Sequence, residues 1–486
     1  MPPRAARAAD VTLDPGRIES IVADVLERLE TPGRGAGAAA GGAAAPLGVH
    51  PTLDAAVQAA RDSFAAFDRT PLETRRAIVA AVRAGLLANL RVLSETAVTE
   101  TGLGRVEDKL IKNQLVAEKT PGPEDLEPLT WTGDHGMTLL ERAPYGVIAV
   151  ITPVTNPSET VINNGLSMIA GGNTVVVCPH PNARRVSNLT IDIMNRAARR
   201  AGAPLPLFHS VEQPTLEVAQ ALLRYKGIRL NVVTGGPGVV REALAAGKKA
   251  ITAGPGNPPA VVDETADLEK AARDLSFGAS LDNNIICTDE KEVIAVALIA
   301  DRLKEAFARA GAVVLAPHQT EKLRALLLEK ENGPRKHAVI QRSFVGKNVD
   351  TILAAAGIPC DAGRRLAVCE VDNDHPFLWT EMMMPVLPLT RVRSVDEAID
   401  FAIEVEHGFR HTASMHSRNI DKLSKMARAC DCSIFVKNGP NAAGLGWGGE
   451  GPTSFTIASP SGEGMTTARS FTRVRRCTLV DHFRIV

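Results

Sequence analysis

The chain has 486 residues, which is long for a single hydrophobic core and predicts two or three domains. Its 55 Lys and Arg residues balance 55 Asp and Glu residues, and only 4% of the residues are aromatic. This composition argues against a nucleic-acid-binding protein, which needs a basic surface and aromatic side chains on which bases stack. No apolar run approaches the length of a membrane span, so we expect no membrane insertion.

The cysteines and histidines do not suggest a metal site or a disulfide framework. The seven cysteines are odd in number and scattered, and no CxxC pair has a matching set of Cys or His residues. Cys430 and Cys432 form a CxC without further ligands nearby, and His407, His411 and His416 have the spacing of a loop and a strand. We therefore expect a reducing cytoplasm and no bound metal.

Residues 1–30 predict an amphipathic helix, and residues 31–46 predict a flexible linker rich in Ala and Gly. Between Ile18 and Leu29 the apolar residues fall on one helical stripe, and the apolar segment of a secretion signal is missing. Because a short helix is not stable by itself, its apolar face needs a covering surface. That surface could belong to this protein or to a groove on another protein, and the long linker favours the second alternative.

Residues 47–252 predict a doubly wound α/β domain. Helical patterns between His50 and Leu93 are followed by a stretch rich in Pro and Gly at 120–134, which we interpret as a loop. The apolar run Val147–Ile151 predicts a buried strand of a parallel sheet. Strands and helices then alternate at the spacing of βαβ units. Further helices are expected at 158–170, 185–201, 216–223 and 239–245, and further strands at 174–178, 230–233 and 248–253, with another beginning at 207.

The turn Thr234-Gly235-Gly236-Pro237-Gly238 lies between a predicted strand and a predicted helix. Free backbone N–H groups at such a helix start can face a pyrophosphate. The turn lacks the GxGxxG fingerprint, and similar turns also serve only to reverse the chain. Spacing alone leaves both interpretations open.

Residues 253–438 predict a second α/β domain, and residues 439–486 are expected to return to the first. The expected elements are an apolar helix at 292–310 and strands at 312–315, 367–371 and 433–436. The tail after Ser470 alternates polar and apolar residues and could pair with a partner strand.

Cys287 is the candidate nucleophile. It precedes Thr288, Asp289 and Glu290, which have the composition of an acidic helix start. The positive end of a helix at this point would lower the thiol pKa and favour the reactive thiolate. The alternative is a buried structural cysteine.

Five motifs follow one another along the chain, and together they resemble the aldehyde dehydrogenase superfamily over about residues 50 to 480. They are Pro144–Pro157, Ala170–Val176, Val233–Gly235, the stretch about Cys287, and Glu381–Val386. The resemblance implies an aldehyde dehydrogenase-like α/β fold. This fold has a Rossmann-type cofactor domain, an α/β catalytic domain and a small oligomerisation flap.

Further motifs are similar to those of the CoA-acylating aldehyde dehydrogenases of bacterial microcompartments, the propionaldehyde and acetaldehyde dehydrogenase group. They are Thr155–Thr160, Pro179–Pro181, Gly254–Pro259, Asp282–Asn284 and Glu406–Thr412. The N-terminal helix resembles the encapsulation peptide of such enzymes, which implies a shell or core protein as partner and the microcompartment lumen, within the cytoplasm, as location. The family's exchanged strands correspond to 124–143 and the tail, which implies a homo-oligomer, a dimer or a tetramer.

The resemblance also implies roles for individual residues. Cys287 would attack the aldehyde, and the Asn156 side chain with the Cys287 backbone N–H would hold the oxyanion. CoA would then take the acyl group from Cys287. The residues implied to contact NAD are Thr152, Pro153, Thr234, Gly235, Gly236 and Glu381.

Two departures from the superfamily pattern bear on the reaction. Ala253 stands where hydrolytic members have a general-base glutamate, so water lacks an activator and the CoA thiol can compete for the thioester. Cys178 replaces the superfamily's ribose-binding lysine, and we assign it no role. We expect oxidation of propionaldehyde or acetaldehyde to acyl-CoA. One alternative is a hydrolytic NAD-dependent aldehyde dehydrogenase that gives the free acid; the other is an inactive scaffold, against which Cys287, Asn156 and Glu381 argue.

Overall fold

The computed structural model describes residues 46–486, which form one compact unit. The predicted helix at 1–30 and nearly all of the predicted linker lie outside the described residues. Within residues 46–486 no single helix is long and apolar enough to cross a membrane. The helices α3 (Leu72–Leu87) and α4 (Leu90–Thr101) reach that composition only as a pair, and they are bent by 63°.

A six-stranded parallel sheet forms the core of the first half of the chain. Its strand order is β1-β6-β5-β4-β7-β8. The strands are β1 (Val49–His50), β4 (Val147–Thr152), β5 (Thr174–Pro179), β6 (Phe208–Val211), β7 (Leu230–Thr234) and β8 (Lys249–Ala253). Every residue of β4 and β5 is buried, as a strand covered on both faces requires. The predicted strands of this domain and its doubly wound arrangement are confirmed.

The chain order reverses between β4 and β7. The chain adds β5 and β6 on one side of β4, and β7 and β8 on the other. Ligands of doubly wound sheets bind beyond the carboxyl ends of the strands at such a reversal. Thr152 ends β4 and Thr234 ends β7, so both lie at this point.

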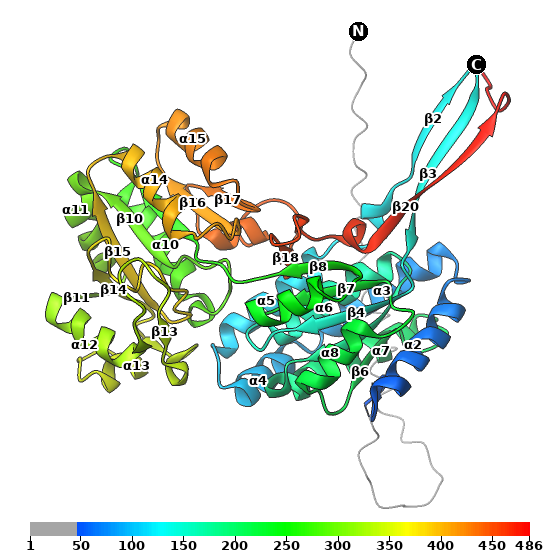
Figure 1. Ribbon diagram of the computed structural model, residues 1–486, viewed down its shortest axis with the longest axis horizontal. Helices are drawn as coiled ribbons and strands as arrows, with labels where there is room; N and C mark the ends of the chain where they lie inside the picture. Colours follow the sequence, from blue (N-terminus) through cyan, green and yellow to red (C-terminus); the bar gives the residue numbers. More distant parts are fainter. Residues whose placement is uncertain (1–45) are drawn as a thin grey trace, which may run out of the picture. The chain divides into compact units, whose positions relative to one another are not determined.

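Helices cover the first sheet, and α6 (Pro157–Ala170) is the most enclosed, since all of its residues are buried. It packs against α5 (Val106–Lys119) and against β4 and β5. The remaining helices are α2 (Leu53–Phe67), α7 (Arg184–Arg200), α8 (Leu216–Arg224) and α9 (Pro237–Leu244). Figure 1 shows them in blue to green around the sheet. The helices predicted at 158–170, 185–201, 216–223 and 239–245 are confirmed.

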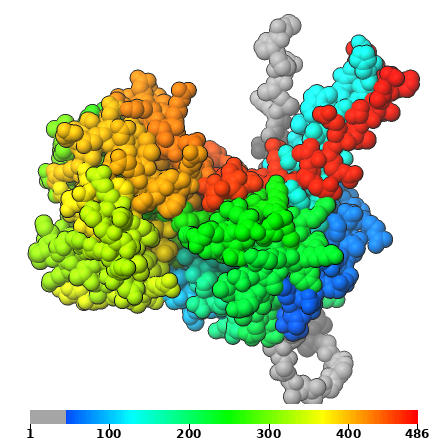
Figure 2. Space-filling view, in the orientation of Figure 1, coloured from blue at the N-terminus to red at the C-terminus, as the bar shows by residue number. Residues whose placement is uncertain are grey.

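A seven-stranded parallel sheet forms the core of the second half, in the order β11-β14-β15-β10-β9-β16-β17. The strands are β9 (Pro259–Val262), β10 (Glu292–Val296), β11 (Val313–Leu315), β14 (Ala367–Glu370), β15 (Val386–Val392), β16 (Thr412–His416) and β17 (Ile434–Lys437). The helices are α10 (Leu268–Ser280), α11 (Ala297–Arg309), α12 (Pro317–Leu327), α13 (Val349–Ala355), α14 (Val395–Val405) and α15 (Ile420–Cys430). Figure 2 shows this half in yellow to orange, beside the blue and green first half.

The helix predicted at 292–310 is wrong at its start. Residues 292–296 form β10, which pairs with β9 and β15 in the middle of the sheet. All five residues are buried, and the helix α11 begins only at Ala297. A continuous apolar run fits a buried strand or a buried helix equally well, and here the neighbouring strands decide.

A third, antiparallel sheet consists of β2 (Leu129–Gly133), β3 (Gly136–Pro144) and β20 (Thr472–Val480). The loop predicted at 120–134 is therefore wrong for its last residues, which form β2. The tail does pair as a strand, and its partner in this chain is β3, over nine residue pairs. Figure 1 shows the three strands extending away from the two parallel sheets. Two short hairpins complete the fold: β12 (Leu328–Lys330) with β13 (Val339–Ile340), and β18 (Ile457–Ala458) with β19 (Gly464–Met465).

Candidate active site

Cys287 lies in a turn between a short 3₁₀ segment, η3 (Leu281–Asn284), and β10. No helix starts after it, so the predicted lowering of its pKa by a helix dipole is wrong. Burial, and then the Glu381 carboxylate, raise the pKa of the Cys287 thiol to about 12, while the Lys291 ammonium acts in the opposite direction. At rest the cysteine is a thiol.

The turn before Cys287 has a left-handed backbone at three consecutive residues. Asp282, Asn283 and Asn284 have φ angles of 47°, 57° and 65°. This conformation costs most L-residues about 1–2 kcal/mol each, and Asp and Asn tolerate it best. The Asn283 side chain donates hydrogen bonds to the Gly346 carbonyl and the Asn348 side chain, both at 2.9 Å. The motif Asp282–Asn284 is therefore a built turn, held by its own side chains.

Lys291 closes the loop that carries Cys287. Its Nζ donates to the Asn284 carbonyl at 2.8 Å, to the Asn284 side chain at 2.9 Å and to the Ile286 carbonyl at 3.0 Å. The Asn284 side chain donates in turn to the Glu290 carbonyl at 2.9 Å. The backbone on both sides of Cys287 is thus fixed by buried polar contacts.

Asn156 sits at the N-cap of α6 but does not cap it. Its Oδ1 accepts a hydrogen bond of 2.7 Å from Lys112 Nζ, while its Nδ2 donates only a long bond of 3.3 Å to the Thr155 hydroxyl. Asn is a favoured N-cap residue because its oxygen usually accepts from the first helical N–H groups. Here that oxygen is engaged elsewhere, and the amide N–H₂ group is available as a donor.

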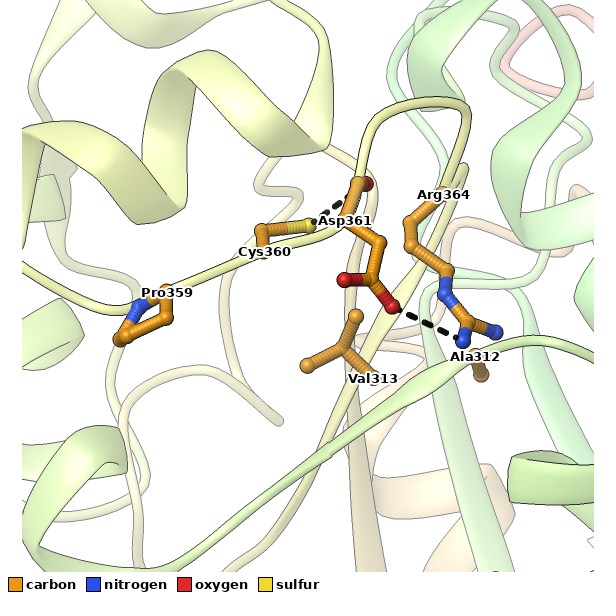
Figure 3. Close-up of a pocket in the computed structure, with 6 residues that line it drawn as sticks. All are labelled: Ala312, Val313, Pro359, Cys360, Asp361 and Arg364. Carbon is orange, nitrogen blue, oxygen red and sulfur yellow. Dashed lines mark hydrogen bonds and ion pairs between the residues drawn. The ribbon is translucent and has the colours of Figure 1, made fainter.

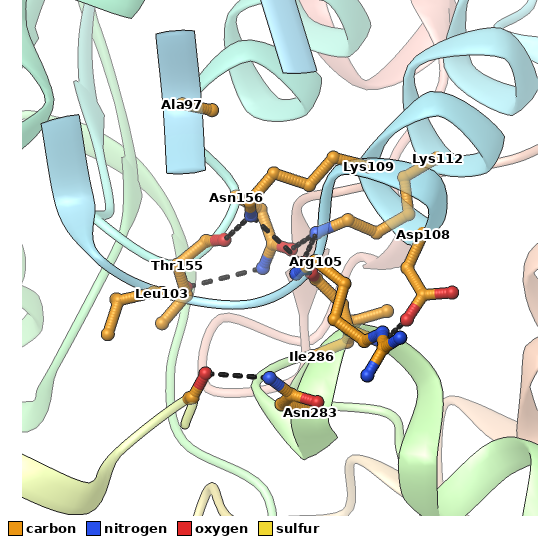
Figure 4. Close-up of polar contacts among 12 residues, drawn as sticks. Ala97, Leu103, Arg105, Asp108, Lys109, Lys112, Thr155, Asn156, Asn283 and Ile286 are labelled. Carbon is orange, nitrogen blue, oxygen red and sulfur yellow. Dashed lines mark hydrogen bonds and ion pairs between the residues drawn. The ribbon is translucent and has the colours of Figure 1, made fainter. Parts of the chain in front are cut away.

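A buried charge cluster consists of Lys109, Lys112, Glu159 and Asp282. Figure 4 shows its two lysines beside Asn156. The Nζ of Lys109 lies 2.9 Å from Asp282, and the Nζ of Lys112 lies 2.6 Å from Asp282 and 3.0 Å from Glu159. Burial acts to lower the pKa of Lys112, but the two carboxylates raise it overall. The cluster joins α5, α6 and η3, and its two positive and two negative charges balance.

Sequence reasoning missed this cluster. The sequence pattern that could have indicated it is the spacing of four polar residues on one face of α5: Asp108, Lys109, Lys112 and Asn113. Such a pattern usually marks a solvated helix face. In the structure all four residues are buried. Only the charged residues that face α5 from α6 and η3 distinguish a buried polar face from a solvated one.

Of the residues predicted to contact NAD, all but Glu381 lie at the reversal between β4 and β7. Thr152 ends β4 and Pro153 follows it, and the Thr152 hydroxyl is buried without a hydrogen-bond partner in the described residues. Gly235 and Gly236 follow β7 and lead into α9. The Thr234 hydroxyl shares a hydrogen bond of 2.9 Å with the Thr456 hydroxyl, so this side chain is already engaged.

The start of α9 fits a dinucleotide pyrophosphate. Gly236 is its N-cap and is exposed, and a Cβ atom at Gly236 would meet nothing within 4 Å. The backbone of this turn therefore borders open space, with free N–H groups at a helix start.

Glu381 approaches Cys287 from the second half of the chain. Burial raises its pKa to about 7, against the effects of Lys291 and the Gly256 backbone N–H, which lower it. The same Lys291 charge acts on Cys287. The nearby carboxylate has no side-chain donor in the described residues, which fits an acceptor for the hydroxyl groups of a bound ribose.

No carboxylate occupies the end of β8, where Ala253 is 3% exposed. Gly256, farther along, approaches Cys287 so closely that a Cβ atom would lie 2.7 Å from the Cys287 carbonyl oxygen and 3.0 Å from Cγ of His411. Glycine is required there because any larger residue would displace the nucleophile or the histidine.

His411 is a candidate that sequence reasoning considered only as a metal ligand. Its ring is buried, its Nδ1 shares a hydrogen bond of 2.9 Å with the Thr412 hydroxyl, and its Nε2 has no partner in the described residues. Burial, and then Lys291, lower its pKa to about 4, so the ring is neutral near pH 7 and can accept a proton. Within residues 46–486 no group of three His, Cys, Asp or Glu side chains could hold a metal ion.

A surface pocket of about 290 Å³ lies beside β11, apart from these residues (Figure 3). Its arginine, Arg364, is paired with Asp361 at 3.3 Å and donates to the Gly311 carbonyl at 3.0 Å. The charge is therefore neutralised within the pocket, and none of the predicted site residues lines it.

Comparisons with known proteins agree over nearly the whole chain. The profile of the aldehyde dehydrogenase family matches residues 42–467. The acetylating acetaldehyde dehydrogenase EutE of Salmonella typhimurium is 50% identical over 441 residues, which cover 90% of this chain and 94% of that enzyme.

Two solved structures are similar in fold as well as in sequence. The propionaldehyde dehydrogenase of Rhodopseudomonas palustris, with bound CoA and an acylated cysteine, has a TM-score of 0.86 and 48% identity over 89% of this chain and 98% of that one. The propionaldehyde dehydrogenase from the fucose utilisation microcompartment of Clostridium phytofermentans has a TM-score of 0.88 and 43% identity over 90% of this chain and 100% of that one.

Proposed function

The chain belongs to the aldehyde dehydrogenase family, and from this premise we propose that it oxidises a short-chain aldehyde, propionaldehyde or acetaldehyde, to the acyl-CoA with NAD and CoA. The observation that carries the proposal is the fixed Cys287 loop together with the end of β8, where Ala253 stands and no carboxylate is present. A thioester on Cys287 therefore lacks the carboxylate that hydrolytic members use at this position to activate water. The relatives named above support the same acceptor, since they are an acetylating enzyme and an enzyme with bound CoA.

In the first half-reaction the Cys287 sulfur attacks the aldehyde carbon, and the thiol proton passes to solvent as the new C–S bond forms. The carbonyl electron pair moves to the oxygen, which the Asn156 amide and the Cys287 backbone N–H hold. NAD, when bound, supplies the hydride acceptor at this carbon. Glu381 would orient the nicotinamide ribose, and Thr152, Pro153, Thr234, Gly235 and Gly236 would line the rest of its path. A thioester on Cys287 remains.

In the second half-reaction the CoA sulfur attacks the thioester carbon, and the bond from that carbon to Cys287 breaks. The neutral ring of His411 can take the CoA thiol proton, because its Nε2 lacks any other partner in the described residues. The protonated His411 ring then gives this proton to the departing Cys287 sulfur, and the free thiol is restored.

We propose two assemblies for the enzyme. The helix at 1–30 would bind a microcompartment shell or core protein, as the N-terminal pattern and the microcompartment origin of a similar structure support. The three-stranded sheet of β2, β3 and β20 would join subunits into a dimer or tetramer, since its exposed Leu129, Trp131 and Val474 leave apolar surface uncovered in one chain.

One assay tests the reaction. NADH formation from propionaldehyde and NAD is measured with and without CoA, for the wild type and for Cys287→Ser. We expect turnover only with CoA and none in the variant. Continuous CoA-independent turnover to free acid would support the hydrolytic alternative, and no turnover under any condition would support the scaffold. For the targeting segment, a reporter fused to residues 1–30 should co-localise with shells, and a diffuse signal would contradict that role.

A further inference from the structure

We propose that Lys112 is a positioning residue for the oxyanion site: it fixes the Asn156 amide with its N–H₂ group toward the substrate and ties that amide to the loop of Cys287. The inference rests on the proposed function in that Asn156 is taken as the oxyanion donor. It concerns the first half-reaction, which precedes the choice between CoA and water.

The contact between the two side chains determines how the amide is turned. An ammonium group donates three hydrogen bonds and accepts none. The Asn156 atom that lies 2.7 Å from Lys112 Nζ is therefore the oxygen, and the N–H₂ group must face the other way. A free asparagine amide can flip by rotation of its last torsion, and a flipped amide would present an acceptor to the developing oxyanion. Lys112 excludes that orientation.

Lys112 also connects the two halves of the site. Its ammonium lies 2.6 Å from Asp282, the first residue of the left-handed turn before Cys287. The Asp282 carboxylate further accepts from the Arg105 backbone N–H at 2.8 Å. One cation thus contacts the oxyanion donor and the nucleophile loop together, so their relative position depends on it (Figure 4).

The neighbouring Lys109 provides an internal comparison. It lies one helical turn earlier on α5 and also pairs with Asp282, at 2.9 Å. Its other bond goes to the Thr155 backbone carbonyl, at 3.3 Å, and not to the Asn156 side chain. Both lysines are thus buried and paired with Asp282, and only Lys112 also contacts the Asn156 side chain and Glu159.

The charge of Lys112 also strengthens the Asn156 donor. A hydrogen bond from a cation to an amide oxygen draws electron density from the amide nitrogen, so its N–H groups become better donors inside a site of low dielectric constant. Asp282 and Glu159 keep Lys112 charged at all working pH values, since together they raise its pKa. Because the oxyanion forms only in the transition state, we expect Lys112 to affect the rate of this step rather than the binding of the aldehyde.

The test measures the first NADH burst in a single turnover of the full chain and, in parallel, the alkylation of Cys287 by iodoacetamide. Alkylation builds no oxyanion, so a loss of fold or of thiol reactivity lowers both rates, and a loss of oxyanion positioning lowers only the burst. Lys112→Met should slow the burst roughly tenfold to a hundredfold, somewhat less than removal of a whole oxyanion donor, and should leave the alkylation rate nearly unchanged. Lys109→Met should slow the burst clearly less.

A double-mutant cycle then asks whether Lys112 acts through Asn156. In an Asn156→Ala background, Lys112→Met should have little further effect on the burst. Equal effects in both backgrounds, equal effects of Lys109→Met and Lys112→Met, or a parallel fall in alkylation would each overturn the proposal. If Lys112→Met does not fold because Glu159 is left unpaired, the charge-balanced variant Lys112→Met with Glu159→Gln carries the same comparison. Because the burst does not need CoA, failure of the proposed acceptor would be seen separately, in the wild type.

Discussion

The two sides of the candidate site are built in opposite ways. On the nucleophile side, Asp282, Asn283 and Asn284 are buried, their left-handed backbone is held by side-chain contacts, and Lys112 and Lys291 tie them to the rest of the site. On the cofactor side, Gly236 at the start of α9 is exposed, borders open space and offers only backbone groups.

The difference matches what an acyl-transfer enzyme must do. The group that carries the acyl intermediate stays in one place through both half-reactions, so its geometry is fixed by the chain itself. The co-substrates have to enter and leave within each turnover, so the surface that meets them stays open. The predictions below test this contrast from its strongest expected effect to its weakest.

Asn156→Ala tests the fixed side most severely. It removes the amide donor of the oxyanion site, so the NADH burst should slow by about 10²- to 10³-fold, with the apparent affinity for aldehyde nearly unchanged. Single-turnover fluorescence of NADH measures both. A rise in the aldehyde concentration for half-maximal rate, with the maximal rate unaltered, would contradict the assigned role.

His411→Gln separates the two half-reactions. The burst should persist, while steady-state turnover with CoA should fall roughly tenfold to a hundredfold, the low end for a general base because the CoA thiol ionises partly by itself. Raising the pH should restore part of the loss, since more CoA is then thiolate. If burst and steady state fall together, His411 does not serve acyl transfer.

A matched pair of alanine variants compares the two sides directly in stability. Asn283→Ala removes two hydrogen bonds and puts a residue less tolerant of left-handed backbone at φ 57°, so we expect a loss of about 1–3 kcal/mol. Gly236→Ala has an ordinary φ of −68° and open space around the new Cβ, so stability should change by less than about 0.5 kcal/mol. Chemical denaturation measures both.

The Gly236→Ala variant should instead weaken the binding of NAD, because the added methyl group would lie where the pyrophosphate is proposed to bind. Isothermal titration with NAD serves as its readout. Equal destabilisation by the two variants would remove the contrast between a fixed side and an open side.

For Glu290 we predict a smaller, pH-dependent effect on folding stability. Burial raises its pKa to about 8 in the folded chain, so the folded state holds this proton more tightly than the unfolded state, whose pKa is near the usual 4.5. The resulting stability is complete below the unfolded pKa and is lost as the pH rises through about 8.

Glu290→Gln should therefore flatten the fall in melting temperature between pH 5 and pH 9, by comparison with the wild type and with the exposed control Glu107→Gln. Parallel curves for all three proteins would show that Glu290 does not hold a shifted proton.

The fold was predictable where an apolar run fits only one type of secondary structure. Val147–Ile151 lies between turns and is too short for a helix, so its assignment as a buried strand is right. The run at 292–310 fits both a buried strand and a buried helix, and only the strands on either side of β10 determine that its first residues are extended. The strand β2 alternates apolar and polar residues over Leu129–Thr132, but it is short and follows a stretch rich in Pro and Gly, which favoured a loop.

The members of the site remain predictions from the resemblance, and the contacts that support them came only from the structure. The resemblance named Cys287, Asn156 and Glu381, and the structure brings Cys287 and Glu381 together within reach of Lys291. The thiolate expected from a helix dipole is wrong, because the chain turns into β10 at that point. The role of Lys112 could not be predicted, because it depends on ion pairs with Asp282 and Glu159, which are distant in sequence.

The most direct test of the central claim is the stoichiometry of NADH released without CoA. We expect one NADH per Cys287, followed by a stall with the acyl group on that cysteine, and a second phase that starts when CoA is added and yields acyl-CoA. NADH that continues to accumulate without CoA, together with free acid, would show that water takes the acyl group and would contradict CoA as the acceptor.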